Sequence, residues 1–144
     1  MDNRYQAYRQ VELNTANRGN IVVMLYSGAI TFLNKAKMYM ENKDYENKSK
    51  FLTKALNIVE ELNVALDLQK GGEIAQNLKS LYLFLDRFLN QANIENDTHK
   101  IDKAIQILER LKTAFDEILK NPENLEAQSI SRMEQAQNCI RKII

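Results

Sequence analysis

Apolar residues recur every three or four positions along most of this chain, which is the spacing of one face of an α-helix. Four such runs cover residues 22–40, 52–66, 74–92 and 101–118. No segment of useful length alternates apolar and polar residues as a half-buried strand does. Gly and Pro, which most often interrupt regular structure, number only 4 and 1 in 144 residues. The pattern predicts four helices of about 20 residues, each about 30 Å long.

Polar residues indicate where these helices begin. Asn17 or Asn20 can cap the first helix, and Asp44 stands before the second. Asp97 or Thr98 can cap the fourth. The oxygens of such side chains accept hydrogen bonds from the unpaired amides of a first helical turn.

Glycine and proline indicate where two helices end. Gly71-Gly72 is the only double glycine, and it predicts the end of the second helix and the turn into the third. Asn121-Pro122 predicts the end of the fourth helix, because proline lacks an amide hydrogen and clashes with the preceding turn. Proline is also favoured at a first helical position, and a weaker helical run follows it, from Leu125 to Ile143.

Short connections make helices that follow one another antiparallel. We therefore predict an all-α fold, an antiparallel up-down four-helix bundle with an N-terminal capping arm and a C-terminal helical extension. The chain is expected to be one helical-bundle domain over residues 1–144, with the arm at 1–17, the four-helix core at 18–120 and the extension at 121–144.

The composition argues against several classes of partner. The chain has 20 Lys and Arg against 19 Asp and Glu, a net charge of +1, which is too balanced to attract nucleic acid by charge alone. The first ten residues lack an apolar signal-peptide core, and the longest apolar run, Ile21 to Tyr26, is far shorter than a membrane span of about 20 residues. A single Cys is compatible with a reducing compartment. We expect a cytoplasmic protein with no nucleic-acid partner and no membrane insertion.

His99 and Cys139 are the residues to test for chemistry. A di-iron bundle needs Glu-x-x-His on two helices, but this chain has 1 His, and Asn96 stands three residues before it. His99 is interpreted as an exposed residue in the first turn of the fourth helix. Cys139 has no His nearby and is interpreted as a small packing residue. We expect no catalytic residue, no metal, no cofactor and no enzyme activity.

The arm is the unusual segment. Tyr5, Tyr8 and Val11 have helical spacing, whereas Val11 and Leu13 have the spacing of a strand. This mixed pattern suits a segment that packs on the bundle without a strong conformation of its own. Two interpretations stay open: a cap that completes the core, or a displaceable lid over an apolar groove that another protein uses.

The start of the first helix is apolar on every side over Ile21 to Tyr26. A surface helix has one apolar face, so part of this segment must face something other than the bundle centre. The arm, a partner helix or both could cover it. Apolar grooves in soluble proteins usually mark interaction sites.

Several segments resemble a known family. Tyr8 to Ala16, followed by Leu-Tyr-Ser-Gly-Ala-Ile at 25–30, is similar to the opening of the FliS-type flagellin export chaperones. Ile58 to Asn63, Leu66-Asp67 with Lys-Gly-Gly-Glu-Ile-Ala at 70–75, and Leu81-Tyr82 match in the same order. The resemblance spans about residues 5–120. Family members often begin the first helix with Ser-Pro, which this chain replaces.

The resemblance implies an antiparallel four-helix bundle with an N-terminal segment across one end. It implies a chaperone that binds the disordered C-terminal region of flagellin, prevents premature polymerisation and delivers flagellin to the flagellar type III export gate. The N-terminal segment is expected to cover part of the groove and to move when flagellin binds. By position, the partner-binding residues would be Tyr5, Tyr8, Val11 and Leu13 in the arm and Ile21, Val22, Leu25 and Tyr26 at the start of the groove.

Other functions remain possible from the residues alone. The protein could be a helical-bundle adaptor with a different client, or a homodimer whose groove is filled by the partner's arm or tail. A carboxylate–metal bundle ranks third. The sequence leaves the oligomeric state open between monomer and dimer, and leaves open whether the arm competes with the client or supports its binding.

Overall fold

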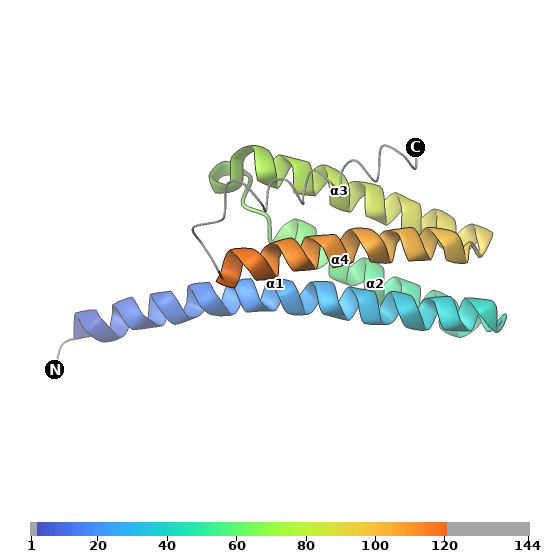
Figure 1. The fold of residues 1–144 in the computed structure, drawn as a ribbon, viewed down its shortest axis with the longest axis horizontal. Helices are drawn as coiled ribbons and strands as arrows, with labels where there is room; N and C mark the ends of the chain where they lie inside the picture. Colours follow the sequence, from blue (N-terminus) through green and yellow to red (C-terminus); the bar gives the residue numbers. More distant parts are fainter. Residues whose placement is uncertain (1–2, 121–144) are drawn as a thin grey trace.

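Four helices make up the part of the chain that the structure describes. The structure is a computed structural model; it describes residues 3–120 and, within them, the side chains of residues 19–120. The helices are α1 (Asn3–Glu41), α2 (Tyr45–Val64), α3 (Leu68–Glu95) and α4 (Thr98–Lys120). Figure 1 shows consecutive helices running in opposite directions, and both α1 and α3 pack against α2 and α4. The described residues contain no strand, so the predicted all-α antiparallel four-helix bundle is confirmed.

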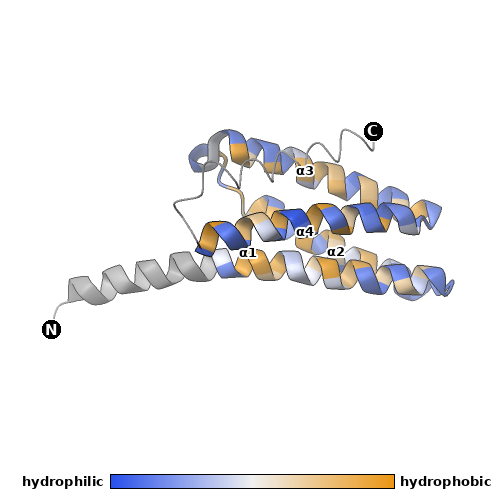
Figure 2. Cartoon of the chain, viewed as in Figure 1, coloured by the Kyte–Doolittle hydropathy of each residue, from blue (hydrophilic) through white to orange (hydrophobic). Residues whose placement is uncertain are grey.

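The core is built from the four periodic runs. Figure 2 shows apolar and polar residues alternating around the described helices, as amphipathic helices do. Removing a Leu- or Ile-sized side chain from water stabilises the fold by about 1.5–3 kcal/mol. The largest fully buried side chains are Tyr26, Leu33, Leu52, Leu85, Leu89, Ile101, Ile107, Leu108 and Leu111.

Aspartates begin three of the helices. The Asp44 carboxylate accepts a hydrogen bond from the Asn47 amide at 3.3 Å, which confirms the predicted start of α2. Asp97 accepts from the amides of His99 at 2.9 Å and of Lys100 at 3.2 Å at the start of α4, also as predicted. The sequence analysis missed the third cap, Asp67 of α3. His99 is exposed in the first turn of α4, in agreement with its interpretation.

The predicted arm is not a separate element. α1 begins at Asn3 and continues for 39 residues without interruption, so the prediction that Asn17 or Asn20 begins the first helix was wrong. In Figure 1 the first turns of α1 extend past the ends of the other helices. The side chains of the arm residues Tyr5, Tyr8, Val11 and Leu13 lie outside the described residues.

Gly19 shows why α1 has no break at this point. A Cβ on Gly19 would overlap Cδ2 of Leu119 in α4 and lie 3.3 Å from its Cγ. The missing side chain therefore lets the last turn of α4 approach the α1 backbone closely. Gly19 is a packing residue within a helix rather than a helix boundary.

The prediction that Gly71-Gly72 separates the second and third helices was also wrong. α2 ends at Val64, and α3 already begins at Leu68, so the double glycine lies inside α3. Gly72 has φ 54° and ψ −133°, a conformation that residues with a Cβ rarely adopt, and it bends the helix. The cap at Asp67 starts the helix one turn earlier than the glycines, which then produce a kink instead of a loop.

The tail lies outside the described residues. The structure describes α4 up to Lys120, the last described residue, so the predicted end of this helix before Pro122 stays a prediction. The predicted extension at 121–144, including Cys139, is therefore a prediction that the structure does not address.

Lys48 links the start of α2 to the end of α3 through hydrogen bonds. It is the buried charged residue among the described side chains, with 5% of its surface exposed. Its Nζ donates to the Asn93 carbonyl oxygen at 2.9 Å and to Asn96 Oδ1 at 2.8 Å. Asn96 is the left-handed C-cap of α3, where carbonyl oxygens lack helical partners and the helix dipole favours a cation.

A Tyr–Tyr hydrogen bond joins α1 to α3 through the middle of the bundle. The hydroxyl groups of Tyr26 and Tyr82 are hydrogen-bonded to each other. Burial raises the pKa of the Tyr82 hydroxyl to about 12. Burial, and then the neighbouring Tyr82, raise the pKa of the Tyr26 hydroxyl well above its ordinary value.

Replacing Lys48 with Met keeps an unbranched apolar stem but removes the donor for two oxygens at the end of α3. We expect Lys48→Met to lower the free energy of unfolding by about 2 kcal/mol. Lys50→Met, at an exposed position of α2, is the matched control, with an expected change below about 0.5 kcal/mol. Urea denaturation followed by far-UV circular dichroism measures both; equal losses would contradict the role of the ammonium group.

The tyrosine pair makes stability fall at alkaline pH. An unfolded tyrosine ionises near pH 10, whereas the raised pKa values keep both hydroxyls protonated in the folded protein. The stability they contribute is complete below pH 10 and is lost as the pH rises toward about 12. For Tyr82 the loss at pH 11 amounts to about 1 kcal/mol.

We therefore expect Tyr26→Phe/Tyr82→Phe to lose stability less steeply than the wild type between pH 9 and pH 11. Urea unfolding at a series of pH values measures both slopes. Between pH 7 and pH 9 the difference between the two proteins should stay constant. Parallel curves up to pH 11 would show that the pair does not govern the alkaline loss.

Candidate functional site

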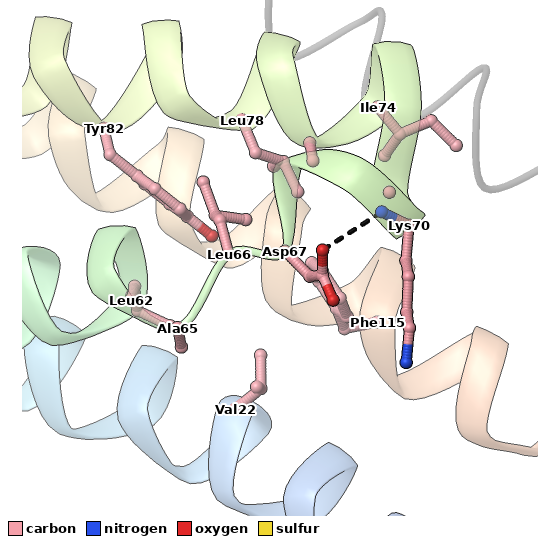
Figure 3. Close-up of a pocket in the computed structure, with 12 residues that line it drawn as sticks. Val22, Leu62, Ala65, Leu66, Asp67, Lys70, Ile74, Leu78, Tyr82 and Phe115 are labelled. Atoms are coloured by element: carbon pink, nitrogen blue, oxygen red, sulfur yellow. Dashed lines mark hydrogen bonds between the residues drawn. The ribbon is translucent and has the colours of Figure 1, made fainter.

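An apolar cleft lies at the end of the bundle where α2 turns into α3. It has a volume of about 360 Å³, and its lining residues come from all four helices and from the α2–α3 turn (Figure 3). Most of these residues are apolar: Val22, Leu62, Ala65, Leu66, Ile74, Ala75, Leu78, Tyr82 and Phe115.

The first turn of α3 forms one wall of the cleft. Asp67 Oδ1 accepts hydrogen bonds from the amides of Gln69 at 3.1 Å and Lys70 at 3.0 Å, the second of which is drawn in Figure 3. Gly71 also lines the cleft, and a Cβ there would lie 2.6 Å from the Cβ of Ala75. A double glycine is thus needed for close packing at 71 and for the kink at 72.

Aromatic residues form the inner end of the cleft. Phe115 and Tyr82 both line it. The Tyr26 ring lies behind them, with its centroid 5.5 Å from that of Phe115 and its hydroxyl bonded to Tyr82. The hydroxyl pair therefore brings a polar group to this aromatic end of the cleft.

The charged groups at the cleft balance each other. Asp67 and Lys70 are its two charged lining residues, of opposite sign. The cleft therefore offers no net charge to attract an ionic ligand, and burial of apolar surface is the main contribution that it can make to binding.

The structure separates the four residues that were predicted to start a groove. Val22 lines the cleft, and Leu25 packs against the core from a partly buried position. Tyr26 is completely buried, so it supports the cleft from within the core. Ile21 is 53% exposed. The structure thus brings only Val22 of the four to the cleft surface, and the arm residues lie outside the described side chains.

The other lining residues were missed by the sequence analysis. Leu62, Leu66 and Leu78 were assigned to core runs, and Ala65 was not singled out. A signal was present: Leu66-Asp67 stands at the end of an apolar run, five residues before a glycine pair. An apolar run that ends in a capping aspartate marks a turn whose last apolar residues can remain uncovered.

A second hollow lies between α1 and α4. It has a volume of about 530 Å³, and its lining is mainly polar: Ser27, Ile30, Thr31, Glu109, Lys112, Thr113 and Asp116. Hydrated side chains of this kind gain little from being covered, so the apolar cleft is the better candidate for a binding site.

Other kinds of site find no support in the described part of the chain. Within residues 3–120, His, Cys, Asp and Glu form no group of three or more that could hold a metal ion. None of the described helices combines the length and apolar character that crossing a membrane requires.

The chain matches one protein family along most of its length. The model of the family described as flagellar protein FliS matches residues 1–122. The flagellar secretion chaperone FliS of Vibrio cholerae is 37% identical over 129 residues, which cover 87% of this chain and 95% of that protein. The Bacillus subtilis protein of the same name is 41% identical over 98 residues, which cover 68% and 72%.

A third relative, the flagellar secretion chaperone FliS of Salmonella typhimurium, is 36% identical over 118 residues, which cover 78% of this chain and 87% of that protein. These matches confirm the family resemblance found in the sequence, and they extend over the residues that build the bundle and the cleft. The chain belongs to the FliS family of flagellar secretion chaperones.

Proposed function

We propose that this protein is a cytoplasmic export chaperone that binds the disordered C-terminal region of flagellin, prevents its premature polymerisation and delivers it to the flagellar type III export apparatus. The observation that carries the proposal is the apolar cleft beside the α2–α3 turn, in a chain of the FliS family. The protein needs no catalytic group for this task, and we propose that it is not an enzyme.

The chemistry of the cleft suits a disordered client. A segment that orders on binding loses conformational entropy, so its affinity must come from a large buried apolar area. The cleft supplies apolar side chains from all four helices at one place. Three exposed apolar residues stand within two positions of a lining residue in the chain: Ile21 and Met24 on α1 and Val64 at the end of α2 are 53%, 70% and 74% exposed.

We place the client's main contact at Val22, Leu62, Leu66 and Phe115, and we include Ile21 and Leu25 at its edge. Tyr26 does not reach the cleft surface; its hydroxyl holds Tyr82 in place through their hydrogen bond. The arm residues Tyr5, Tyr8, Val11 and Leu13 belong to the proposed surface because they stand on the same helix as Val22. The loaded complex would then engage a component of the export gate.

Calorimetry tests the cleft. The wild type should bind the C-terminal segment of the cognate flagellin one to one, with a strongly negative change in heat capacity. Val22→Glu places a charge on the cleft wall and should weaken binding at least tenfold, or about 1.4 kcal/mol. Ile94→Glu is the matched control, because Ile94 is 82% exposed near the far end of α3, and it should bind like the wild type.

Thermal unfolding of both glutamate variants must first show that they fold. If the wild type does not bind the flagellin segment, the proposed function is wrong. If Val22→Glu and Ile94→Glu bind equally well, flagellin binds elsewhere on the bundle.

Deletion of residues 1–17 tests the arm. We expect the deletion to change the affinity for the flagellin segment, because α1 continues directly from the arm to the cleft wall at Val22. Tighter binding would identify the arm as a competitor for the cleft, and weaker binding as part of the client site. Titration calorimetry with full-length and shortened protein measures the difference, and identical affinities would exclude the arm from the site.

A further inference from the structure

The two buried tyrosines carry one more hydrogen-bond donor than they use. Each hydroxyl has one proton, and a single hydrogen bond between the two uses one of them. No other hydrogen bond of either hydroxyl occurs within the described residues. The second proton therefore points at something other than the partner tyrosine.

The surroundings decide which hydroxyl holds the spare proton. Tyr26 is completely buried and does not line the cleft, whereas Tyr82 does line it. If Tyr82 donated to Tyr26, the Tyr26 proton would stay in the core without an acceptor, at a cost of about 1–3 kcal/mol. If Tyr26 donates instead, the spare proton belongs to Tyr82, where the contents of the cleft can accept it.

The close-up shows where the Tyr82 hydroxyl lies. Figure 3 shows the Tyr82 side chain reaching from α3 toward Leu66, with the hydroxyl oxygen at its tip. The neighbouring lining groups Leu62, Leu66 and Phe115 have no side-chain acceptor. An occupant that covers the Tyr82 hydroxyl therefore has to accept this proton itself or lose affinity.

We propose that Tyr82 acts as a hydrogen-bond donor at the inner end of the cleft, so that the cleft selects an apolar group that carries an uncharged oxygen acceptor. A purely aliphatic group would fill the space but leave the Tyr82 proton unpaired. A carboxylate would satisfy the proton but lose its hydration among apolar side chains. An amide, hydroxyl or backbone carbonyl oxygen next to an apolar group meets both requirements.

The inference deepens the proposed function and rests on it for the natural occupant, which is the flagellin segment. It adds that the client presents such an oxygen at the cleft, in addition to apolar surface. The Tyr26–Tyr82 pair would then take part in recognising the client as well as in joining α1 to α3.

Two small probes of nearly the same shape test the selectivity without flagellin. Acetophenone carries a carbonyl oxygen where α-methylstyrene carries a CH₂ group. Methyl NMR titrations that follow Val22, Leu62, Leu66 and Leu78 give both dissociation constants and show that the probes enter the cleft. We expect Tyr82→Phe to reduce the preference for acetophenone over α-methylstyrene by about fivefold to tenfold relative to the wild type.

Tyr45→Phe is the matched control, because it removes the same atom from an exposed tyrosine at the start of α2, away from the cleft. It should keep the wild-type preference. A preference in Tyr82→Phe within twofold of the wild type, an equal loss in Tyr45→Phe, or no movement of the cleft methyl signals with either probe would overturn the proposal.

A measurement on the wild type covers the case in which Tyr82→Phe does not fold. The ¹³C resonance of a labelled acetophenone carbonyl moves downfield when the oxygen accepts a hydrogen bond. We expect the bound probe to show this shift, and a bound resonance at its value in hydrocarbon solvent would overturn the proposal. Failure of flagellin binding with intact probe selectivity would refute the proposed function alone, whereas lost selectivity with intact flagellin binding would refute this inference alone.

Discussion

The hydrogen bond between Tyr26 and Tyr82 connects the packing of the bundle to its binding surface. The two residues lie on α1 and α3, helices that are not neighbours in the ring, so their hydroxyls meet across the core. Both side chains are nearly inaccessible, yet Tyr82 also forms part of the cleft. The position of the inner end of the cleft therefore depends on the same contact that holds the bundle together. Phe115 adds α4 to this arrangement through its contact with Tyr26.

Different hydrogen bonds satisfy the polar groups at the helix ends on the two sides of the bundle. At the end where α1 turns into α2, the ammonium of Lys48 satisfies oxygen atoms of Asn93 and Asn96. At the opposite end, Asp67 satisfies amides of the first turn of α3, but no side chain among residues 19–120 covers the apolar residues around it. An end with satisfied backbone groups and uncovered apolar side chains keeps its shape without a partner and still gains free energy when one binds.

Periodic spacing predicted the elements of the fold that depend on local sequence. The four helical runs, the caps at Asp44 and Asp97 and the exposed His99 all follow from residues close in the chain. The structural roles of Gly19 and Gly72 could not be predicted from neighbouring residues. Gly19 lies in α1 because Leu119, 100 positions later, approaches its backbone, and Gly72 bends a helix that Asp67 had already begun. A glycine looks the same in the sequence whether it ends a helix, bends it or allows a close contact.

The cleft was only partly predictable for a related reason. The all-round apolar segment at Ile21 to Tyr26 correctly indicated that α1 faces more than the bundle centre, yet it could not tell the cleft residue Val22 from the core residue Tyr26. Core and cleft residues follow the same helical spacing, and they differ only in whether another helix covers them. At the α2–α3 turn this depends on the kink at Gly72, which sets the first turn of α3 apart from the rest of the helix. A substitution at Gly72 would therefore act on the cleft through the backbone, without removing any side chain that a client touches.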